Sequence, residues 1–376
     1  MCTIAIQPDD IGLRSGRRQS YSTRWAELAR QSSHEVRLVN AFQPDFFAQL
    51  AGCDGFMWSF AHPPFPRNFG KRLLPAIEHG LGIPVFPSWR TAWHFDDKLS
   101  QQYLLQAAGI PTPWTWIFWR AEAALEFCRS ASYPLVIKLA TGIVAENVRL
   151  LDSVGEAEHW IRRLFGPGVT ALDEPRPRYR RLFARLRAAA RFALTGWPSV
   201  TGTSRTDLQR GYLLIQEFLP GNQFDTRVTI IGNRAFAFRR FNRPNDFRAS
   251  GSGLRDLDPS RIDLDAVRLA FRVAQVLGAH QSLAVDVLRR GPEREPVITE
   301  ISYYYEGWVL HEECSGHWVL HGDPDTGDLE WINRRIRAED AIWEDFIAEV
   351  VALQGRPAPG RPGDALTAPH AAARHG

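Results

Sequence analysis

The sequence lacks the features that tie a chain to a membrane, to nucleic acid or to an oxidising compartment. It has no run of eighteen apolar residues, so no transmembrane helix is expected. Its start, MCTIAIQPDD, has no basic region followed by an apolar core, so it is not a secretory signal. The formal net charge of +3 is too small to indicate nucleic-acid binding, and none is expected. The four cysteines form no CxxC pair and give no sign of a disulfide framework or a zinc site, which favours a reducing cytoplasm.

Repeats and nucleophile motifs are also missing. The 13 tryptophans follow no fixed period, so neither a propeller nor a solenoid is indicated. No Ser-His-Asp or Cys-His arrangement is convincingly placed. What remains is a chain of 376 residues with 44% apolar and 23% charged content, which is ordinary for a globular protein of two or three domains.

Residues 1 to about 90 alternate short strands with helical segments, a pattern that predicts a parallel sheet. Ligands of such sheets bind beyond the carboxyl ends of the strands. The segment SFAHPPFP follows the third predicted strand and is therefore a candidate substrate loop. The alternative is that its prolines only stiffen a connection.

Two lysines stand where a positive charge is unfavourable unless an anion binds there. We interpret Asp96 as a helix N-cap, which puts Lys98 in the first turn, where the helix dipole favours negative charge. An anion bound at this helix end would remove the conflict. Lys138 lies inside the apolar strand PLVIKL, where a buried lysine needs a partner such as phosphate. The alternative is an edge-strand lysine that reaches solvent.

A basic segment interrupts the chain at about 166–210, and we interpret it as an insertion. Seven arginines lie between Arg176 and Arg191 and are interleaved with leucine and phenylalanine, which predicts a basic amphipathic helix. Three roles fit this pattern: a weak contact with an anionic surface through residues 175–198, a polyanionic partner, or a solvated cap.

The stretch Leu283–Trp308 predicts two short strands separated by a break at Gly291-Pro292. Asp286 lies inside the first strand and Glu300 inside the second. Unpaired carboxylates in half-buried strands are costly, and two that face each other repel unless a cation lies between them. Mg²⁺ uses one or two carboxylates together with substrate phosphates, so the stretch predicts a Mg²⁺–nucleotide site. The alternative is that both carboxylates face water.

Other patterns complete the predicted elements. RVTIIGNRAFAFRRF predicts a hairpin that turns at Gly232-Asn233. A helix is expected from Asp263 to Leu277 and a helical stretch from Trp331 to Leu353. The tail that begins at Gln354 is rich in proline, glycine and alanine and is predicted to be disordered.

The order of these pieces resembles the ATP-grasp superfamily, specifically the carboxylate–amine ligases of its ribosomal-protein-glutamate-ligase-like (RimK-like) branch. The pieces are DDKL…GIPTP, PLVIK, IQEFLPG…DTRV, FRR…NDFRASGSG and AVDV…ITEIS, within about residues 90–305. The resemblance implies a mixed α/β and α+β fold: two α+β lobes that grip ATP, preceded by a small parallel-sheet α/β domain. The implied division is 1–90 for that domain, 91–215 for the central lobe with the insertion, 216–335 for the C-terminal lobe, 336–353 for a terminal helix and 354–376 for the tail.

The resemblance also implies a role for each site residue. Residues expected to bind ATP through its phosphates, adenine or ribose are Lys98, Lys138, Gln216, Glu217, Phe218, Leu219 and Asp225. Residues expected near the transferred phosphate are Arg227, Arg240 and Arg248. Residues expected to hold Mg²⁺ are Asp286, Glu300 and Ser302.

Two positions depart from the family pattern. Ser302 stands where the family usually has asparagine, and a hydroxyl is a weaker metal ligand, which leaves open whether one or two Mg²⁺ ions bind. The phosphate-covering loop of the family is rich in glycine, but Leu139–Asn147 has only Gly142. Grip on the phosphates must then come from backbone groups or from elsewhere.

The activity that the resemblance implies is an ATP-dependent ligation. ATP would phosphorylate a carboxylate, an amine would attack the resulting acyl phosphate, and ADP and phosphate would leave. The expected substrates are a small-molecule or peptide carboxylate and an amine. Two alternatives remain: a small-molecule kinase that stops at phosphoryl transfer, and a nucleotide-binding regulatory protein without ligase activity.

Overall fold

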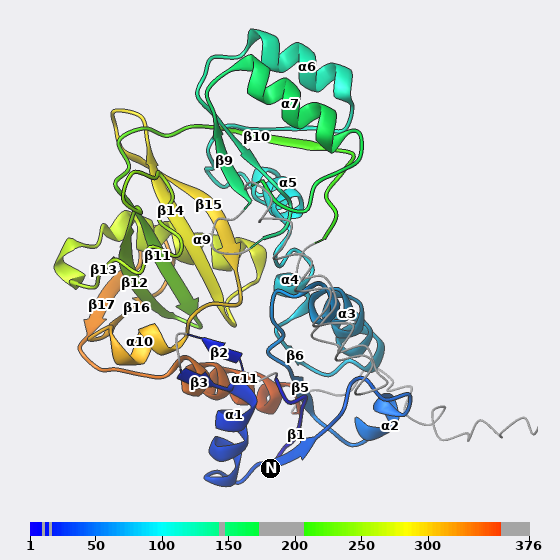
Figure 1. Cartoon of the computed structure of the whole chain (residues 1–376). Helices are drawn as coiled ribbons and strands as arrows, with labels where there is room; N and C mark the ends of the chain where they lie inside the picture. The colour runs from blue at the N-terminus through cyan, green and yellow to red at the C-terminus, as the bar shows by residue number, and fades with distance from the viewer. Residues whose placement is uncertain (10–11, 15–16, 143–146, 173–206, 355–376) are drawn as a thin grey trace, which may run out of the picture.

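A computed structural model of the chain describes residues 1–9, 12–14, 17–142, 147–172 and 207–354 (Figure 1). The predicted amphipathic helix of the basic insertion and residues 355–376 of the predicted disordered tail lie outside these residues. The prediction is wrong for Gln354, which is the last residue of a helix. No helix among the described residues is long and apolar enough to cross a membrane. All four cysteines are buried and free.

The N-terminal unit is built on a parallel sheet, as the alternating pattern predicts. Its strands follow the order β4-β1-β5-β6 and have the bounds β1 (Thr3–Ile6), β4 (Glu35–Leu38), β5 (Gly55–Met57) and β6 (Val85–Phe86). Its helices are α1 (Tyr21–Arg30), α2 (Phe46–Gln49), α3 (Pro64–Pro75), the π-helical turn η1 (Ala76–Leu81) and α4 (Trp89–Ala92). A small hairpin of β2 (Gly12–Arg14) and β3 (Arg17–Gln19) was not expected from the sequence.

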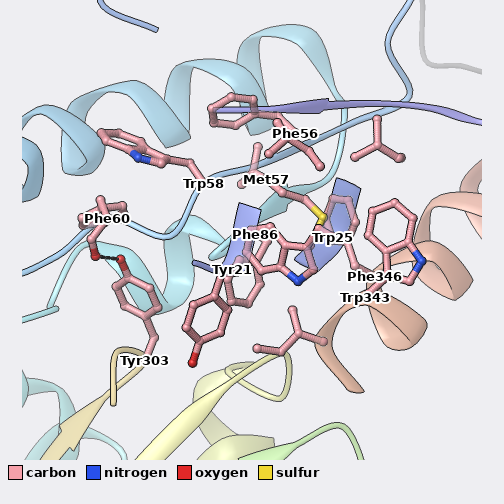
Figure 2. Close-up of a cluster of buried hydrophobic side chains, with 14 of the residues drawn as sticks. Tyr21, Trp25, Phe56, Met57, Trp58, Phe60, Phe86, Tyr303, Trp343 and Phe346 are labelled. Atoms are coloured by element: carbon pink, nitrogen blue, oxygen red, sulfur yellow. Dashed lines mark hydrogen bonds between the residues drawn. The ribbon is translucent and has the colours of Figure 1, made fainter. Parts of the chain in front are cut away.

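The last helix returns to the first unit. In α11 (Ala338–Gln354), the backbone carbonyl of Glu339 accepts a hydrogen bond from the indole of Trp25, 3.1 Å away. One apolar core joins the N-terminal unit to α11 and to the segment that follows Ser302, as Figure 2 shows for Trp25, Tyr303 and Phe346. The two ends of the described chain are therefore stabilised by the same packing.

The central lobe is a four-stranded antiparallel sheet covered by two helices. Its strands follow the order β7-β10-β8-β9 and have the bounds β7 (Thr115–Phe118), β8 (Leu135–Lys138), β9 (Val148–Leu151) and β10 (Leu213–Glu217). The helices α6 (Ala121–Ser130) and α7 (Val154–Leu164) lie together at the top of Figure 1 and share a core with the sheet. Ser153 caps α7, where its side chain accepts a hydrogen bond from the backbone N–H of Glu156.

The C-terminal lobe is a seven-stranded antiparallel sheet. Its order is β15-β14-β11-β12-β16-β17, with β13 beside β12. The strands are β11 (Phe224–Ile231), β12 (Arg234–Phe241), β13 (Arg255–Asp256), β14 (Leu283–Arg290), β15 (Glu295–Ser302), β16 (His317–His321) and β17 (Asp328–Ile332). The helical elements are α9 (Leu264–Leu277), α10 (Trp308–Glu312) and η3 (Pro259–Arg261), and α5 (Lys98–Ala107) leads from the first unit into the lobes.

Most predicted elements of this lobe are confirmed, and one is wrong. The hairpin turns at Gly232, whose φ of 61° suits glycine, and α9 ends at Gly278. The helical stretch predicted from Trp331 is wrong at its start, because Trp331 belongs to β17 and α11 begins at Ala338. The Trp331 ring packs on that of Trp318 on the neighbouring strand, with centroids 4.5 Å apart. This cross-strand contact stabilises the pairing of β16 with β17 and explains why Trp331 belongs to a strand and not to a helix.

Candidate active site

One face of the seven-stranded sheet carries a row of charged side chains. Asp286 on β14 lies opposite Glu300 on β15 and opposite Arg227 on β11. Asp225 on β11 lies opposite Arg240 on β12. Because side chains alternate along a strand, the intervening apolar residues face the other way and join the core under α9. The strand pattern thus places five predicted site residues on one surface.

Four of these residues form a closed ionic network. The guanidinium of Arg240 donates to both carboxylate oxygens of Asp225, at 2.8 and 2.6 Å, and also to Asp286, at 2.7 Å. Arg227 donates to both oxygens of Asp286, at 2.7 and 2.8 Å. Burial acts to raise the pKa of Asp286, but the two guanidinium groups outweigh it and hold that pKa below its usual range. Asp225, which the resemblance places near the ribose or the metal shell, has Arg240 as its partner in this structure.

The two predicted phosphate lysines lie beside Glu300. The Nζ atom of Lys98 is 3.7 Å from Oε1 of Glu300 and 3.5 Å from the carbonyl of Gly142. Lys138 ends strand β8 and is buried, and burial lowers its pKa to about 8 despite the nearby carboxylate of Glu300. A buried ammonium beside a second ammonium is poised to bind an anion, because phosphate would offset both costs.

The lysines line a pocket between the two lobes. It is enclosed by residues of α5, of strands β8 and β10 in the central lobe and of β15 in the C-terminal lobe. Its lining residues are Lys98, Gln101, Gln102, Leu105, Lys138, Leu214, Gln216 and Thr299. Both predicted phosphate lysines and Gln216, the first residue of the predicted hinge, therefore line the same pocket.

The predicted hinge, Gln216–Leu219, lies where the chain crosses from the central sheet to the C-terminal sheet. Gln216 is buried on β10, and Glu217 exchanges hydrogen bonds with the backbone of Trp114, at 2.8 and 2.9 Å. The ring of Phe218 meets that of Phe247 edge to face, 5.8 Å between centroids. The segment is therefore attached to both lobes and to the glycine-rich loop that follows β12.

Two further predicted residues have partners of their own. Arg248 pairs with Asp246 at 2.8 Å and donates to the backbone carbonyl of Val148 at 3.1 Å, which links the glycine-rich loop to the central lobe. The hydroxyl of Ser302 donates to the carbonyl of Tyr304 at 2.9 Å and accepts from its N–H at 3.2 Å. Ser302 thus closes a local turn on the same face as Glu300.

The helix at Lys98 departs from the sequence interpretation. Asp97, not Asp96, caps α5, because its carboxylate accepts from the backbone N–H groups of Leu99 and Ser100, each at 3.2 Å. The carboxylate of Asp97 is therefore the anion that compensates the helix dipole beside Lys98. Asp96 adopts a left-handed backbone, with φ of 49°, and its side chain leaves the helix.

Sequence reasoning also missed Arg67, which forms a buried ion pair with Asp96. Its Nη1 atom lies 2.6 Å from Oδ2 of Asp96, and its Nη2 atom contacts Asp207. The only sequence signal is the position of Arg67 directly after the predicted substrate loop. Its partner Asp96 lies 29 residues further along the chain, which no local pattern can reveal.

The residues present fit a magnesium ion held jointly with phosphates. Asp286 and Glu300 occupy paired positions on neighbouring strands; both oxygens of Asp286 accept hydrogen bonds from Arg227 and Arg240, so Glu300 is the more accessible carboxylate for a cation. Within the described part of the chain, no group of three or more His, Cys, Asp or Glu residues is placed to hold a metal alone. Phosphate oxygens and water would therefore have to supply the remaining ligands.

Comparison with known proteins identifies the fold. No family model matches the sequence. The ATP-grasp ligase PsnB, solved with a minimal precursor, superposes with a TM-score of 0.51 at 15% identity, over 93% of this chain and 99% of PsnB. This chain has the ATP-grasp fold. The N5-carboxyaminoimidazole ribonucleotide synthetase of Thermotoga maritima agrees, with a TM-score of 0.51 at 14% identity over 82% of this chain and 70% of that chain. The predicted ATP-grasp fold is therefore confirmed.

Curated relatives of this ATP-grasp chain match it over only part of their own length. The N5-carboxyaminoimidazole ribonucleotide synthase of Mycobacterium bovis is 28% identical over 274 residues, which are 72% of this chain and 51% of that protein. The alpha-aminoadipate–LysW ligase LysX of Sulfurisphaera tokodaii is 28% identical over 209 residues, 55% of this chain and 59% of LysX. The chain thus spans about half the length of the first relative.

Proposed function

We propose that this chain is an ATP-dependent carboxylate–amine ligase of the RimK-like branch. The observation that carries the proposal is the meeting of two lysines, two arginines and two carboxylates in one region between two lobes. Positive charge from both lobes suits a triphosphate, and phosphoryl transfer depends on positioning and charge neutralisation. The names of PsnB and LysX, both ligases, support the same class of reaction.

Each group has a role in this proposal. Lys98 and Lys138 bind the nucleotide phosphates, and Gln216–Leu219 contacts the adenine. Arg227, Arg240 and Arg248 stabilise charge on the phosphoryl group in transfer, and Asp225 orients Arg240. Mg²⁺, held by Asp286 and Glu300 with Ser302 nearby, would neutralise phosphate charge.

The reaction joins two substrates. An oxygen of the carboxylate attacks the γ-phosphorus and ADP leaves. The amine nitrogen then attacks the acyl carbon, the bond between this carbon and the phosphate oxygen breaks, phosphate leaves with the electron pair of that bond, and the amine loses a proton to solvent. We infer that at least one of the two substrates is an amino acid or a peptide, since LysX is named for alpha-aminoadipate and PsnB was solved with a precursor.

The test is ADP release measured over a matrix of acids and amines drawn from amino acids, peptides and amino sugars. A ligase releases ADP only when both substrates are present, and mass spectrometry should find the condensed product. A kinase releases ADP with one substrate and yields a stable phosphorylated product. Tight Mg-ATP binding without ADP release under any combination would favour the regulatory alternative and overturn the proposal.

A further inference from the structure

The chain that leaves strand β8 toward the pocket is held by hydrogen bonds from outside that strand. The backbone N–H of Ala140 donates to the hydroxyl of Tyr212 at 2.7 Å, and its carbonyl accepts from the backbone N–H of Lys98 at 2.8 Å. The hydroxyl of Thr141 accepts from the side chain of Gln209 at 2.9 Å. The exit from β8 is therefore held by contacts with neighbouring segments of the chain.

Gly142 continues this pattern and explains the single glycine of the segment. Its carbonyl accepts from Nζ of Lys98, 3.5 Å away, and its N–H donates to Oδ1 of Asp96 at 3.0 Å. Its φ is 142°, and a Cβ atom there would lie 2.4 Å from the side-chain amide of Asn147. Any other residue would displace Asn147, so glycine is required here for close packing.

Asp96 connects the ATP-grasp lobes to residues of the N-terminal unit. Its Oδ2 atom accepts from Arg67 at 2.6 Å and lies 3.7 Å from Nδ1 of His62. Both Arg67 and His62 follow strand β5 of the N-terminal unit, at the sheet edge where ligands of parallel sheets bind. Burial acts to raise the pKa of Asp96, but His62 and Lys98 outweigh it, so the carboxylate stays ionised.

We propose that Asp96 is a positioning residue that joins the candidate substrate edge of the N-terminal unit, which follows β5, to the backbone that flanks the nucleotide phosphates. One carboxylate accepts from Arg67 on one side and from the N–H of Gly142 on the other. The inference rests on the proposed function, because it takes Lys98 and Lys138 as phosphate ligands. It adds to the proposed site a residue that touches neither the phosphates nor the substrate.

The backbone of Asp96 supports this role. A left-handed conformation is unusual for a residue other than glycine, although Asp and Asn tolerate it better than most. Such a conformation persists only where the surroundings hold it, and such positions cluster at functional sites. Here it directs the side chain away from α5, whose cap is provided by Asp97, and toward Gly142.

The test compares two nucleotides in matched variants. The probes are Mg²⁺ with a non-hydrolysable ATP analogue, which carries three phosphates, and AMP, which lacks the outer two. Asp96→Gly removes the acceptor while suiting the left-handed backbone. It should weaken binding of the ATP analogue at least about tenfold and leave AMP binding unchanged. Asp96→Asn has one acceptor oxygen for two donors, so it should show a smaller loss, about threefold, for the analogue only.

Asp207→Asn is the matched control, since Asp207 contacts the same arginine but not Gly142. It should leave the affinity for both nucleotides unchanged. Equal affinities of wild type and both Asp96 variants for the analogue would overturn the inference. So would an equal loss for the analogue and AMP in folded protein, which is what a purely structural role produces. If wild type binds neither nucleotide, the proposed function itself fails, and the inference falls with it.

Discussion

Arg227 binds both carboxylate oxygens of Asp286, with Nε 2.7 Å from Oδ1 and Nη2 2.8 Å from Oδ2. Arg240 adds a third hydrogen bond to the same carboxylate. Glu300, opposite Asp286 on the next strand, has a side chain that is 35% exposed and pairs only loosely with Lys98. The two carboxylates predicted as equivalent magnesium ligands therefore differ in how much of the fold depends on them.

Replacing these two carboxylates by amides should separate stability from activity. Asp286→Asn leaves two guanidinium groups without their buried counter-ion, so the free energy of unfolding should fall by about 3–5 kcal/mol. Glu300→Gln should change it by less than about 1 kcal/mol, because the side chain is partly exposed. Urea denaturation at neutral pH measures both.

Both amide variants should sharply reduce turnover, but for different reasons. In Glu300→Gln the loss should be accompanied by a weaker dependence on Mg²⁺ concentration, because a ligand charge is missing. Ser302→Asn, which supplies an amide oxygen at the neighbouring position, should be tolerated. Near-native ADP release by Glu300→Gln over a Mg²⁺ titration would show that the metal assignment is wrong.

Nucleotide binding should depend on pH through Lys138. Burial lowers the pKa of Lys138 to about 8, so the ammonium is lost as pH rises above that value. A bound triphosphate should raise this pKa, and binding near pH 9 should therefore take up about one proton. Calorimetry with the ATP analogue in two buffers of different ionisation enthalpy measures the uptake. Lys138→Arg stays charged and should show none; equal uptake in both proteins would contradict the assignment.

Much of the fold could be predicted because its signals are local. The hairpin at Gly232-Asn233 requires a positive φ, and α9 shows a continuous apolar face that ends at Gly278. The helix predicted at Trp331 is wrong because a helical spacing of apolar residues does not reveal a cross-strand partner, and Trp318 is that partner. The register that places Asp286 opposite Glu300 likewise depends on cross-strand pairing, here between two strands joined by the turn at Gly291-Pro292.

The candidate site was predictable in its residues but not in their pairing. A charged residue inside an apolar strand is costly in any fold, so Lys138 and Asp286 stood out in the sequence. Arg67 and Asp96 did not, because each belongs to an ordinary local pattern and only the packing of two units brings them to 2.6 Å. Residue type indicates that a partner is needed, and tertiary structure decides which one.

The contact between the terminal helix and the N-terminal sheet gives a stability test. Phe346 on α11 is almost fully buried, and Phe346→Ala should cost about 3–5 kcal/mol through the cavity that it leaves. A Cβ at Gly55 would lie 2.9 Å from the Phe346 ring, so Gly55→Ala should also destabilise. In the double variant the added methyl enters the vacated space, and the loss should be smaller than the sum. Additive losses by urea denaturation would refute this packing.

His94 should make the protein sensitive to mild acid. It is fully buried, and among the described residues neither ring nitrogen has a hydrogen-bond partner. Burial, aided by the charge of Lys71, lowers its pKa from 6.5 to about 4. Between these values the unfolded chain binds the proton and the folded chain does not, so stability rises with pH across this window and is lost as pH falls through it.

The expected contribution of His94 is about 3 kcal/mol between pH 6.5 and 4, since each pKa unit corresponds to about 1.4 kcal/mol. His94→Phe keeps a ring of similar size and removes the titrating group. It should be at least as stable as wild type at pH 7, because two unsatisfied nitrogens are gone, and should lose less stability on acidification. Carboxylates such as Asp96 titrate in both proteins and cancel in the difference. Urea denaturation at several pH values measures that difference, and parallel pH profiles would exclude His94 as the acid-sensitive group.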